Sequence, residues 1–123
     1  MSTVKQLLPP QSELQSLLQL YQDKHFNDAE KLALSLSQKF PHHQFAWKVL
    51  AVIYKQNGKI LDALIINQKI LTIAPKDAEA HYNFANTLKE LGRFKDAEIS
   101  YGTAIKLKPT YVEAHNNLGI TLK

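Results

Sequence analysis

The residues best suited to metal or proton chemistry in this chain are its five histidines. They are His25, His42, His43, His81 and His115. His81 and His115 lie 34 residues apart, and that step recurs throughout the chain as a structural unit. Two side chains a full unit apart are too distant to share a metal ion, whose ligands must all lie within bonding distance. We therefore expect His81 and His115 to be packing residues, His42 and His43 to lie on a surface turn, and the chain to hold no metal or other cofactor.

Other catalytic chemistry is also poorly represented. The chain has no cysteine, which excludes disulfides and thiol catalysis. It has no Gly-rich phosphate loop, Ser-centred elbow or paired metal motif. The carboxylates Glu90, Asp96 and Glu98 are interpreted as solvated helix faces, with Asp96 near a helix N-terminus, where a negative charge is favourable. We predict that the chain is not an enzyme and acts through its surface.

The elements that position these residues come from an internal repeat of 34 residues. "EAHYN" at 79–83 returns as "EAHNN" at 113–117. The same step separates matching prolines, glycines, aspartates and alanines. The matching sets are Pro41, Pro75 and Pro109; Gly58 and Gly92; Asp62 and Asp96; Ala46, Ala80 and Ala114; Ala63 and Ala97.

Each unit predicts two helices. Trp47, Leu50, Ala51 and Tyr54 fall at i, i+3, i+4 and i+7, which places them on one face of a helix. Glycine then ends this helix, because it readily adopts the left-handed backbone form at a C-terminus. A second apolar run follows and stops at proline, which cannot continue helical hydrogen bonding. Small residues at Ala51, Ala63, Ala85 and Ala97 allow the two helices to approach closely, and each pair must stack on the next to bury its apolar face.

The order and spacing of these residues resemble the tetratricopeptide repeat (TPR) signature. The resemblance covers residues 44–123. The residues that carry it are Trp47, Leu50, Ala51, Tyr54, Ala63 and Pro75, then His81, Phe84, Ala85, Leu88, Ala97, Tyr101 and Pro109, then His115, Leu118, Gly119 and Leu122. It implies an all-α, right-handed solenoid of antiparallel helix pairs, with three repeats and one extra C-terminal helix.

The expected boundaries follow from the repeat. Residues 1–10 form a flexible lead-in that Pro9 and Pro10 end; residues 11–43 form a divergent first repeat. Residues 44–77 and 78–111 form the second and third repeats, and residues 112–123 form the first helix of a fourth repeat or a cap. Tyr21 and Ala29 are eight positions apart where Tyr54 and Ala63 are nine apart, so we predict a turn one residue shorter around Asp23 and Lys24.

The resemblance also implies that the first helix of each pair lines a concave face. The inner positions expected to be exposed there are Phe45, Lys48, Val49, Val52 and Lys55; Glu79, Tyr82, Asn83, Asn86 and Lys89; and Glu113, Asn116, Asn117, Ile120 and Lys123. Asparagine can both donate to and accept from a peptide backbone, and lysine adds charge selectivity. All of these except Val49, Ile120 and Lys123 are our candidate peptide-binding residues.

Two uses of the family's groove can be compared with this chain. The carboxylate clamp of chaperone-binding TPR proteins is matched at Lys48 and Asn83, but not at Val52, Glu113 and Asn117. The asparagine ladder of O-linked N-acetylglucosamine transferase is matched at Asn83 and Asn117 and broken at Val49. The alternative is structural: Asn83 and Asn117 bond within the array.

Charge and hydropathy restrict the partners. The formal net charge is +4, with Arg93 as the sole arginine and no block of basic residues, which argues against nucleic acid. No apolar run is long enough for a signal peptide or a membrane span. We expect a cytoplasmic protein whose partner is a protein or a peptide.

Three functions remain open. The first is a non-catalytic scaffold that binds a protein or peptide segment on its concave face. The second is the recognition region of a larger bacterial glycosyltransferase or sulfotransferase. The similarity of the repeat sequences to those of such enzymes and the unpartnered last helix favour it. The third is self-association into a homo-oligomer, through Leu118 and Leu122 on the C-terminal helix.

Overall fold

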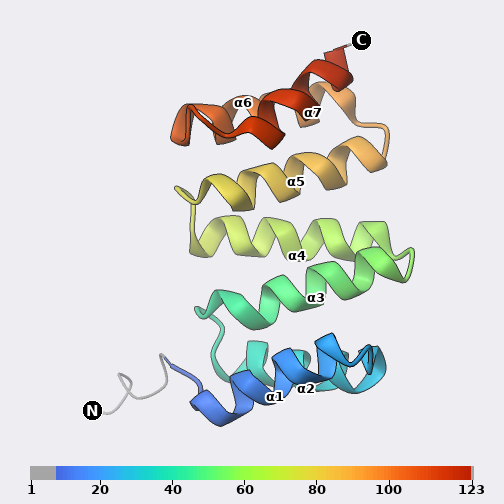
Figure 1. The fold of residues 1–123 in the computed structure, drawn as a ribbon, viewed down its shortest axis with the longest axis vertical. Helices are drawn as coiled ribbons and strands as arrows, with labels where there is room; N and C mark the ends of the chain where they lie inside the picture. Colours follow the sequence, from blue (N-terminus) through green and yellow to red (C-terminus); the bar gives the residue numbers. More distant parts are fainter. Residues whose placement is uncertain (1–7, 123) are drawn as a thin grey trace.

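The computed structural model describes residues 8–122, with side chains from 8 to 120. These residues form seven α-helices and no strand, stacked along the long axis of the molecule (Figure 1). The helices are α1 (Gln11–Gln22), α2 (Phe26–Lys39), α3 (Gln44–Gln56), α4 (Ile60–Ile73), α5 (Ala78–Glu90), α6 (Phe94–Leu107) and α7 (Val112–Leu122).

The helices repeat at the step seen in the sequence. The helices α3, α5 and α7 begin at residues 44, 78 and 112, and the helices α2, α4 and α6 begin at residues 26, 60 and 94. The architecture is a right-handed solenoid of three antiparallel helix pairs followed by one further helix, as predicted. The predicted lead-in, residues 1–10, lies mostly outside the described residues.

Within each pair, a three-residue turn joins the helices. Gly58 and Gly92 occupy its middle position, each at a backbone φ of +79°. Lys24 occupies the same position in the first pair at φ +63°. The turns span residues 23–25, 57–59 and 91–93, so the prediction of a shorter first turn is wrong. The first pair differs in its side chains and not in its backbone: Leu17 is buried at the position where the later pairs carry Ala51 and Ala85.

Between pairs, a ring nitrogen closes the turn that contains proline. Trp47 Nε1 donates to the Pro41 carbonyl oxygen at 3.0 Å. In the next two repeats, Nε2 of His81 lies 2.7 Å from the Pro75 oxygen and Nε2 of His115 lies 2.9 Å from the Pro109 oxygen. A carbonyl oxygen only accepts, so the histidine nitrogens are the donors. This contact explains why one position of the repeat carries tryptophan in one copy and histidine in the next two.

The apolar core is divided into two clusters. The first joins α1, α2 and α3 around Leu17, Leu36 and Leu50. The second joins α5, α6 and α7 with Leu64 of α4, around Leu88 and Tyr101. The buried residues of α3, α4 and α5 that belong to neither cluster form what we call the seam. They are mostly small or polar: Ala51, Ala63, Asn67, Ile70, Ala80 and Thr87.

The C-terminal helix α7 packs part of its apolar surface against this core. Leu118 is half-buried and packs against the second cluster, so it is not a free edge residue. The side chain of Leu122, its expected companion in self-association, lies outside the described residues. Over the described part of the chain, no helix combines the length and apolarity that crossing a membrane requires.

Candidate functional site

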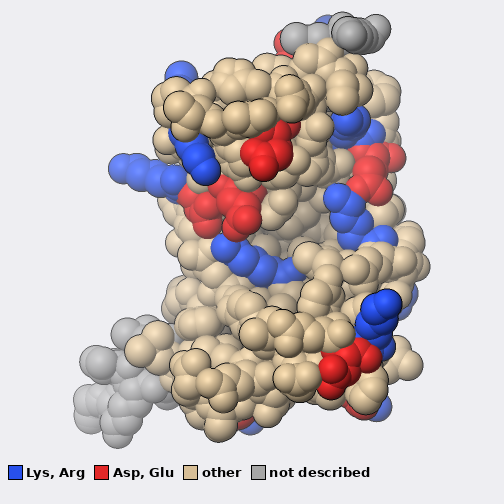
Figure 2. All heavy atoms as spheres, in the orientation of Figure 1, with Lys and Arg blue, Asp and Glu red and all other residues tan. Residues whose placement is uncertain are grey.

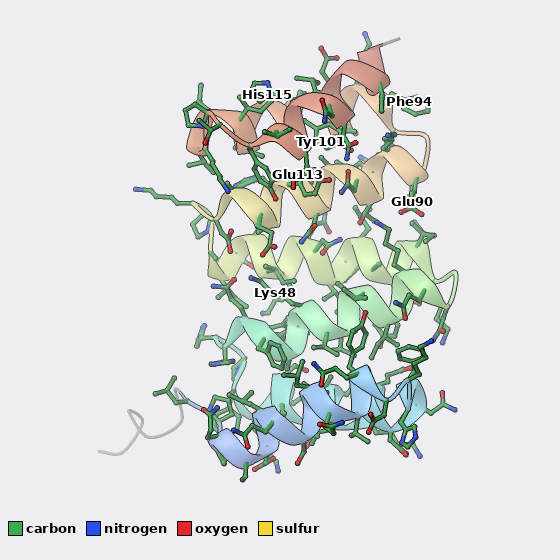
Figure 3. The ribbon with its side chains drawn as sticks, in the orientation of Figure 1. Lys48, Glu90, Phe94, Tyr101, Glu113 and His115 are labelled. Atoms are coloured by element: carbon green, nitrogen blue, oxygen red, sulfur yellow. The ribbon has the colours of Figure 1, made fainter. Side chains whose placement is uncertain are left out.

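The predicted groove residues lie on α3, α5 and α7, the first helices of their pairs. Figure 3 labels Lys48, Glu90 and Glu113 on this side of the molecule, which we call the inner face. Most of the candidates are exposed or half-buried. Those with exposed side chains are Val52, Glu79, Asn83, Glu113 and Asn116; those half-buried are Phe45, Lys48, Lys55, Tyr82, Asn86, Lys89 and Asn117.

Two of the predicted inner positions do not face solvent freely. Val49 is only 7% exposed and belongs to the first core cluster, so the prediction that it is exposed is wrong. Its apolar side chain packs among residues of α1, α2 and α3 that form this cluster. Phe45 is half-buried and packs against the same cluster.

The lysines of α3 are paired with carboxylates of α5 and of Asp77, the residue that caps the start of α5. Lys48 Nζ lies 3.4 Å from Glu79 Oε1 and 3.7 Å from Asp77 Oδ2. Lys55 Nζ lies 2.8 Å from Glu90 Oε1. Figure 2 shows blue and red side chains next to one another around the hollowed centre of the inner face. The inner face therefore carries nearly balanced charge and not the positive charge suggested by its lysines alone.

At the other end of the face, amides and tyrosines tie α7 to α5. Asn117 Nδ2 donates to the Tyr82 hydroxyl and to Asn86 Oδ1, each at 3.0 Å. The Tyr101 hydroxyl, from α6, also donates to Asn86 Oδ1. The rings of Tyr82 and Tyr111 lie 4.9 Å apart between centroids. The structural alternative is thus confirmed for Asn117, whose side chain bonds within the array.

Burial shapes the chemistry of this cluster. It raises the pKa of Tyr101 to about 12, with the neighbouring Tyr82 adding to the shift. Burial, followed by the charge of Glu79, raises the pKa of Tyr111 to about 12. Both phenols therefore stay protonated, and neither can serve as a base near neutral pH.

Asn83 differs from the other inner amides. Its side chain is exposed and makes no hydrogen bond to the part of the chain that the structure describes, while its backbone oxygen accepts from Thr87 Oγ1 at 3.0 Å. Of the two residues predicted to form an asparagine ladder, Asn83 alone therefore has its full amide available. Asn116 and Glu113 also point away from the array, with no bond to other described side chains.

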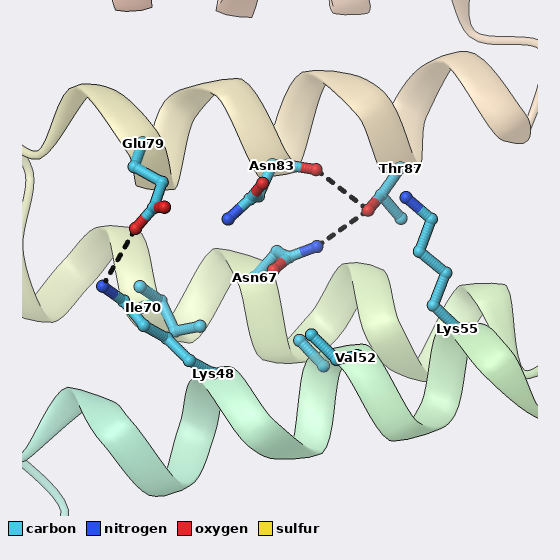
Figure 4. A pocket seen from close by; sticks show the side chains of 9 residues that line it. Lys48, Val52, Lys55, Asn67, Ile70, Glu79, Asn83 and Thr87 are labelled. Carbon is cyan, nitrogen blue, oxygen red and sulfur yellow. Dashed lines mark hydrogen bonds and ion pairs between the residues drawn. The ribbon is translucent and has the colours of Figure 1, made fainter. Parts of the chain in front are cut away.

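A hollow of about 240 Å³ opens beside Asn83, between α3, α4 and α5 (Figure 4). We call it the inter-repeat hollow. Its lining combines an apolar floor with paired charges at the rim. The lining residues are Lys48, Ala51, Val52, Lys55, Asn67, Ile70, Glu79, Asn83 and Thr87.

Sequence reasoning missed the back wall of this hollow. Asn67 Nδ2 donates to Thr87 Oγ1 at 2.8 Å, and both residues are buried. Asn67 lies on the second helix of its pair, outside the positions that line the family's groove. The available signal was in the repeat itself, because Asn67 occupies the position at which the next repeat has Tyr101.

A shallower hollow of about 390 Å³ lies beyond Lys48, at the turn before α3. His42, His43, Gln44 and Phe45 line it together with Lys48 and Asp77. His42 is exposed, as expected for a turn residue, and His43 is half-buried at the start of α3. Among the described residues, no group of three metal-binding side chains converges, here or elsewhere.

Comparison with known proteins identifies the repeat. A family profile described as "Tetratricopeptide repeat" matches residues 67–99, and one described as "TPR repeat" matches residues 85–123. No curated protein matches the chain by sequence.

Solved structures share the fold at low sequence identity. An O-GlcNAc transferase mutant of Thermobaculum terrenum matches 94% of this chain with a TM-score of 0.77 and 21% identity. The first TPR of Spaghetti (RPAP3), bound to the HSP90 peptide SRMEEVD, matches 89% of this chain and 87% of its own, with a TM-score of 0.83 and 14% identity. MamA from Desulfovibrio magneticus matches 92% of this chain and 64% of its own, with a TM-score of 0.81 and 18% identity. The chain spans only 23% of the transferase.

Proposed function

Because this chain is a tetratricopeptide repeat protein, we propose that it is a non-catalytic scaffold that binds a protein or peptide segment along its inner face. The observation that carries the proposal is the inner face itself. Its helices keep an unbonded amide at Asn83, beside a hollow with an apolar floor, and they carry further exposed polar groups at Asn116 and Glu113 on α7. Solvent-facing amides beside apolar surface suit an extended chain, which offers backbone donors and acceptors together with side chains.

The geometry disfavours an acidic chain end as the ligand. The RPAP3 structure holds an acidic HSP90 peptide. Here, Lys48 already faces Glu79 and Asp77, so an incoming carboxylate would compete with resident carboxylates. Glu113 adds repulsion at a position where the carboxylate clamp requires a cation. The ligand that this face supports is therefore not the clamp's ligand.

Capture from a lysate of the source cells tests the proposal. Asn83→Ala and Asn116→Ala remove exposed amides from the inner face, while Gln68→Ala and Glu98→Ala are matched truncations of exposed residues on the second helices α4 and α6. We expect the inner-face pair to reduce recovery of the captured proteins about tenfold, as loss of central contacts does at interfaces. Quantitative mass spectrometry of the eluates measures it. Equal recovery with both pairs of variants, at unchanged circular dichroism, would show that the inner face is not the binding surface.

A second candidate is the recognition region of a larger transferase. The observation that favours it is the match of 94% of this chain to part of the Thermobaculum O-GlcNAc transferase. The reading frame of the natural gene tests it. A frame that encodes no transferase domain would remove this candidate and leave the scaffold proposal intact.

A further inference from the structure

We propose that the inter-repeat hollow is a pocket for one uncharged aliphatic side chain of an extended peptide, and that Asn83 bonds the peptide backbone beside it. The inference rests on the proposed function and specifies the chemistry of its ligand. It follows from a comparison of the second and third repeats, from the floor of the hollow, and from the charges at its rim.

The hollow exists because the two repeats fill equivalent space differently. In the third repeat, Tyr101 is fully buried and reaches Asn86, while Tyr82 packs beside it. One step earlier in the sequence, Asn67 stands in place of Tyr101 and Lys48 in place of Tyr82. Asparagine is much smaller than tyrosine, and Lys48 extends away toward Glu79, so the space that aromatic rings occupy between α5, α6 and α7 is left open between α3, α4 and α5 (Figure 4).

The floor of the hollow is apolar and fixed. Ala51, Val52 and Ile70 line it, and Val52 is 41% exposed. Behind them, Asn67 donates to Thr87, and Thr87 donates to the Asn83 backbone oxygen, which holds the wall in one arrangement. At about 240 Å³, the hollow is smaller than the ~300–1,000 Å³ typical of pockets for whole small molecules, so a single side chain suits it better.

The rim charges argue that this side chain is uncharged. Lys48 is paired with Glu79 on one side, and Lys55 is paired with Glu90 on the other. A charged side chain entering between them would meet like as well as opposite charges that are already paired, and it would lose water without gaining a partner of its own. An aliphatic side chain covers Val52 and Ile70 without disturbing either pair.

Asn83 completes the arrangement. It lines the same hollow, and its side-chain amide offers one donor group and one acceptor to a chain lying across the opening. Both peptide backbone groups can thus be bonded at the residue whose side chain enters the hollow. The pairing of one anchoring side chain with one backbone clamp defines a minimal recognition unit.

Selection from a displayed library of random linear octapeptides tests the inference on three forms of the protein. These are the unmodified chain, Asn67→Tyr, and Gln68→Tyr. Asn67→Tyr installs the residue that the third repeat uses to fill this space, and Gln68→Tyr places the same ring on the exposed side of α4 as a control. We expect peptides enriched on the unmodified chain to share Val, Leu or Ile at one position with uncharged neighbours. A representative enriched peptide should bind Asn67→Tyr about tenfold more weakly, equivalent to about 1.4 kcal/mol, and Gln68→Tyr unchanged.

The possible outcomes distinguish failure of the aliphatic pocket from failure of the proposed peptide binding on the inner face. Enrichment of charged or acidic C-terminal sequences, or equal binding to Asn67→Tyr, overturns the aliphatic pocket, while sensitivity to Asn83→Ala keeps the inner face as the binding surface. Failure to enrich any peptide overturns the pocket as well. Val52→Asp provides a second variant if Asn67→Tyr does not fold, since Val52 is exposed. It should exclude the same aliphatic peptides, and unchanged binding to it contradicts the proposal.

Discussion

At the scale of single residues, one ring nitrogen recurs at the start of every later repeat. Trp47, His81 and His115 each bond the carbonyl oxygen of a proline six positions earlier. The feature that the three side chains share is an N–H at the far edge of a flat ring, and not aromatic bulk alone. Two of the five histidines, His81 and His115, are therefore structural, and the bond each makes places its proton on Nε2.

The variants His81→Phe and His81→Trp distinguish the contribution of the ring's packing from that of its N–H donor. Phenylalanine keeps the ring but cannot donate, so we expect the free energy of unfolding to fall by about 0.5–1.5 kcal/mol. Tryptophan restores the donor that Trp47 already uses, so it should recover most of that loss. Urea denaturation followed by circular dichroism measures both. Equal stability of the two variants would mean that the bond to the Pro75 oxygen contributes nothing.

At the scale of the helix pairs, the turns show where the first repeat is suboptimal. Lys24 holds a left-handed conformation at φ +63°, which a residue with a Cβ adopts at a cost of about 1–2 kcal/mol. Gly58 and Gly92 take the same conformation without that cost. The three hairpins therefore share one backbone, but the first holds it under conformational strain.

Lys24→Gly should raise the free energy of unfolding by about 1 kcal/mol, reduced somewhat by the greater freedom of glycine in the unfolded chain. Gly58→Ala is the reciprocal change and should lower it by a similar amount. A Cβ at residue 58 would meet no atom within 4 Å, so its effect reports the backbone alone. Thermal denaturation of the two variants measures the pair. A stabilising Gly58→Ala would contradict the explanation.

The free energy of unfolding should fall as the pH becomes alkaline, because two tyrosines near α7 resist ionisation in the folded chain. The folded pKa of Tyr101 and that of Tyr111 are each raised to about 12, against about 10 in an unfolded chain. Above about pH 10 the unfolded chain releases phenolic protons that the folded chain retains, so stability is complete below pH 10 and is lost as the pH rises through about 12. Urea denaturation at about pH 8, 10 and 11 measures the decline. Tyr101→Phe should reduce the decline and leave the part due to Tyr111, and an identical decline in that variant would contradict this origin.

At the scale of the whole molecule, the sequence predicts the array well because its signal is repeated. Three prolines and two glycines at one offset specify the helix pairs, their turns and their order. The pattern mispredicts the first turn because Tyr21 and Ala29 are one residue closer than Tyr54 and Ala63, whereas the backbone places Lys24, not a glycine, in the middle of a turn of the same length. Strain tolerated at one residue is not visible in a pattern of residue types.

The candidate site was predictable only in outline. Positions on α3, α5 and α7 follow from the repeat, but whether a side chain there is available depends on its neighbours from other repeats. Asn83 and Asn117 have the same identity at equivalent positions, yet Asn117 is bonded to Tyr82 and Asn86, which have Lys48 and Val52 as their counterparts beside Asn83. Differences between adjacent repeats, more than the repeat itself, therefore locate the hollow.

The division of the core into two clusters gives α4 a particular position in the solenoid. Between the two clusters, the seam contains mostly small side chains and one buried amide-to-hydroxyl bond, and ion pairs connect α3 to α5 beside it. Leu64 of α4 belongs to the second cluster and Ile66 of α4 packs against the first, so α4 makes apolar contacts with both halves of the solenoid. A side chain bound in the inter-repeat hollow would contact Asn67 and Ile70, and it would therefore lie against the helix that both halves share.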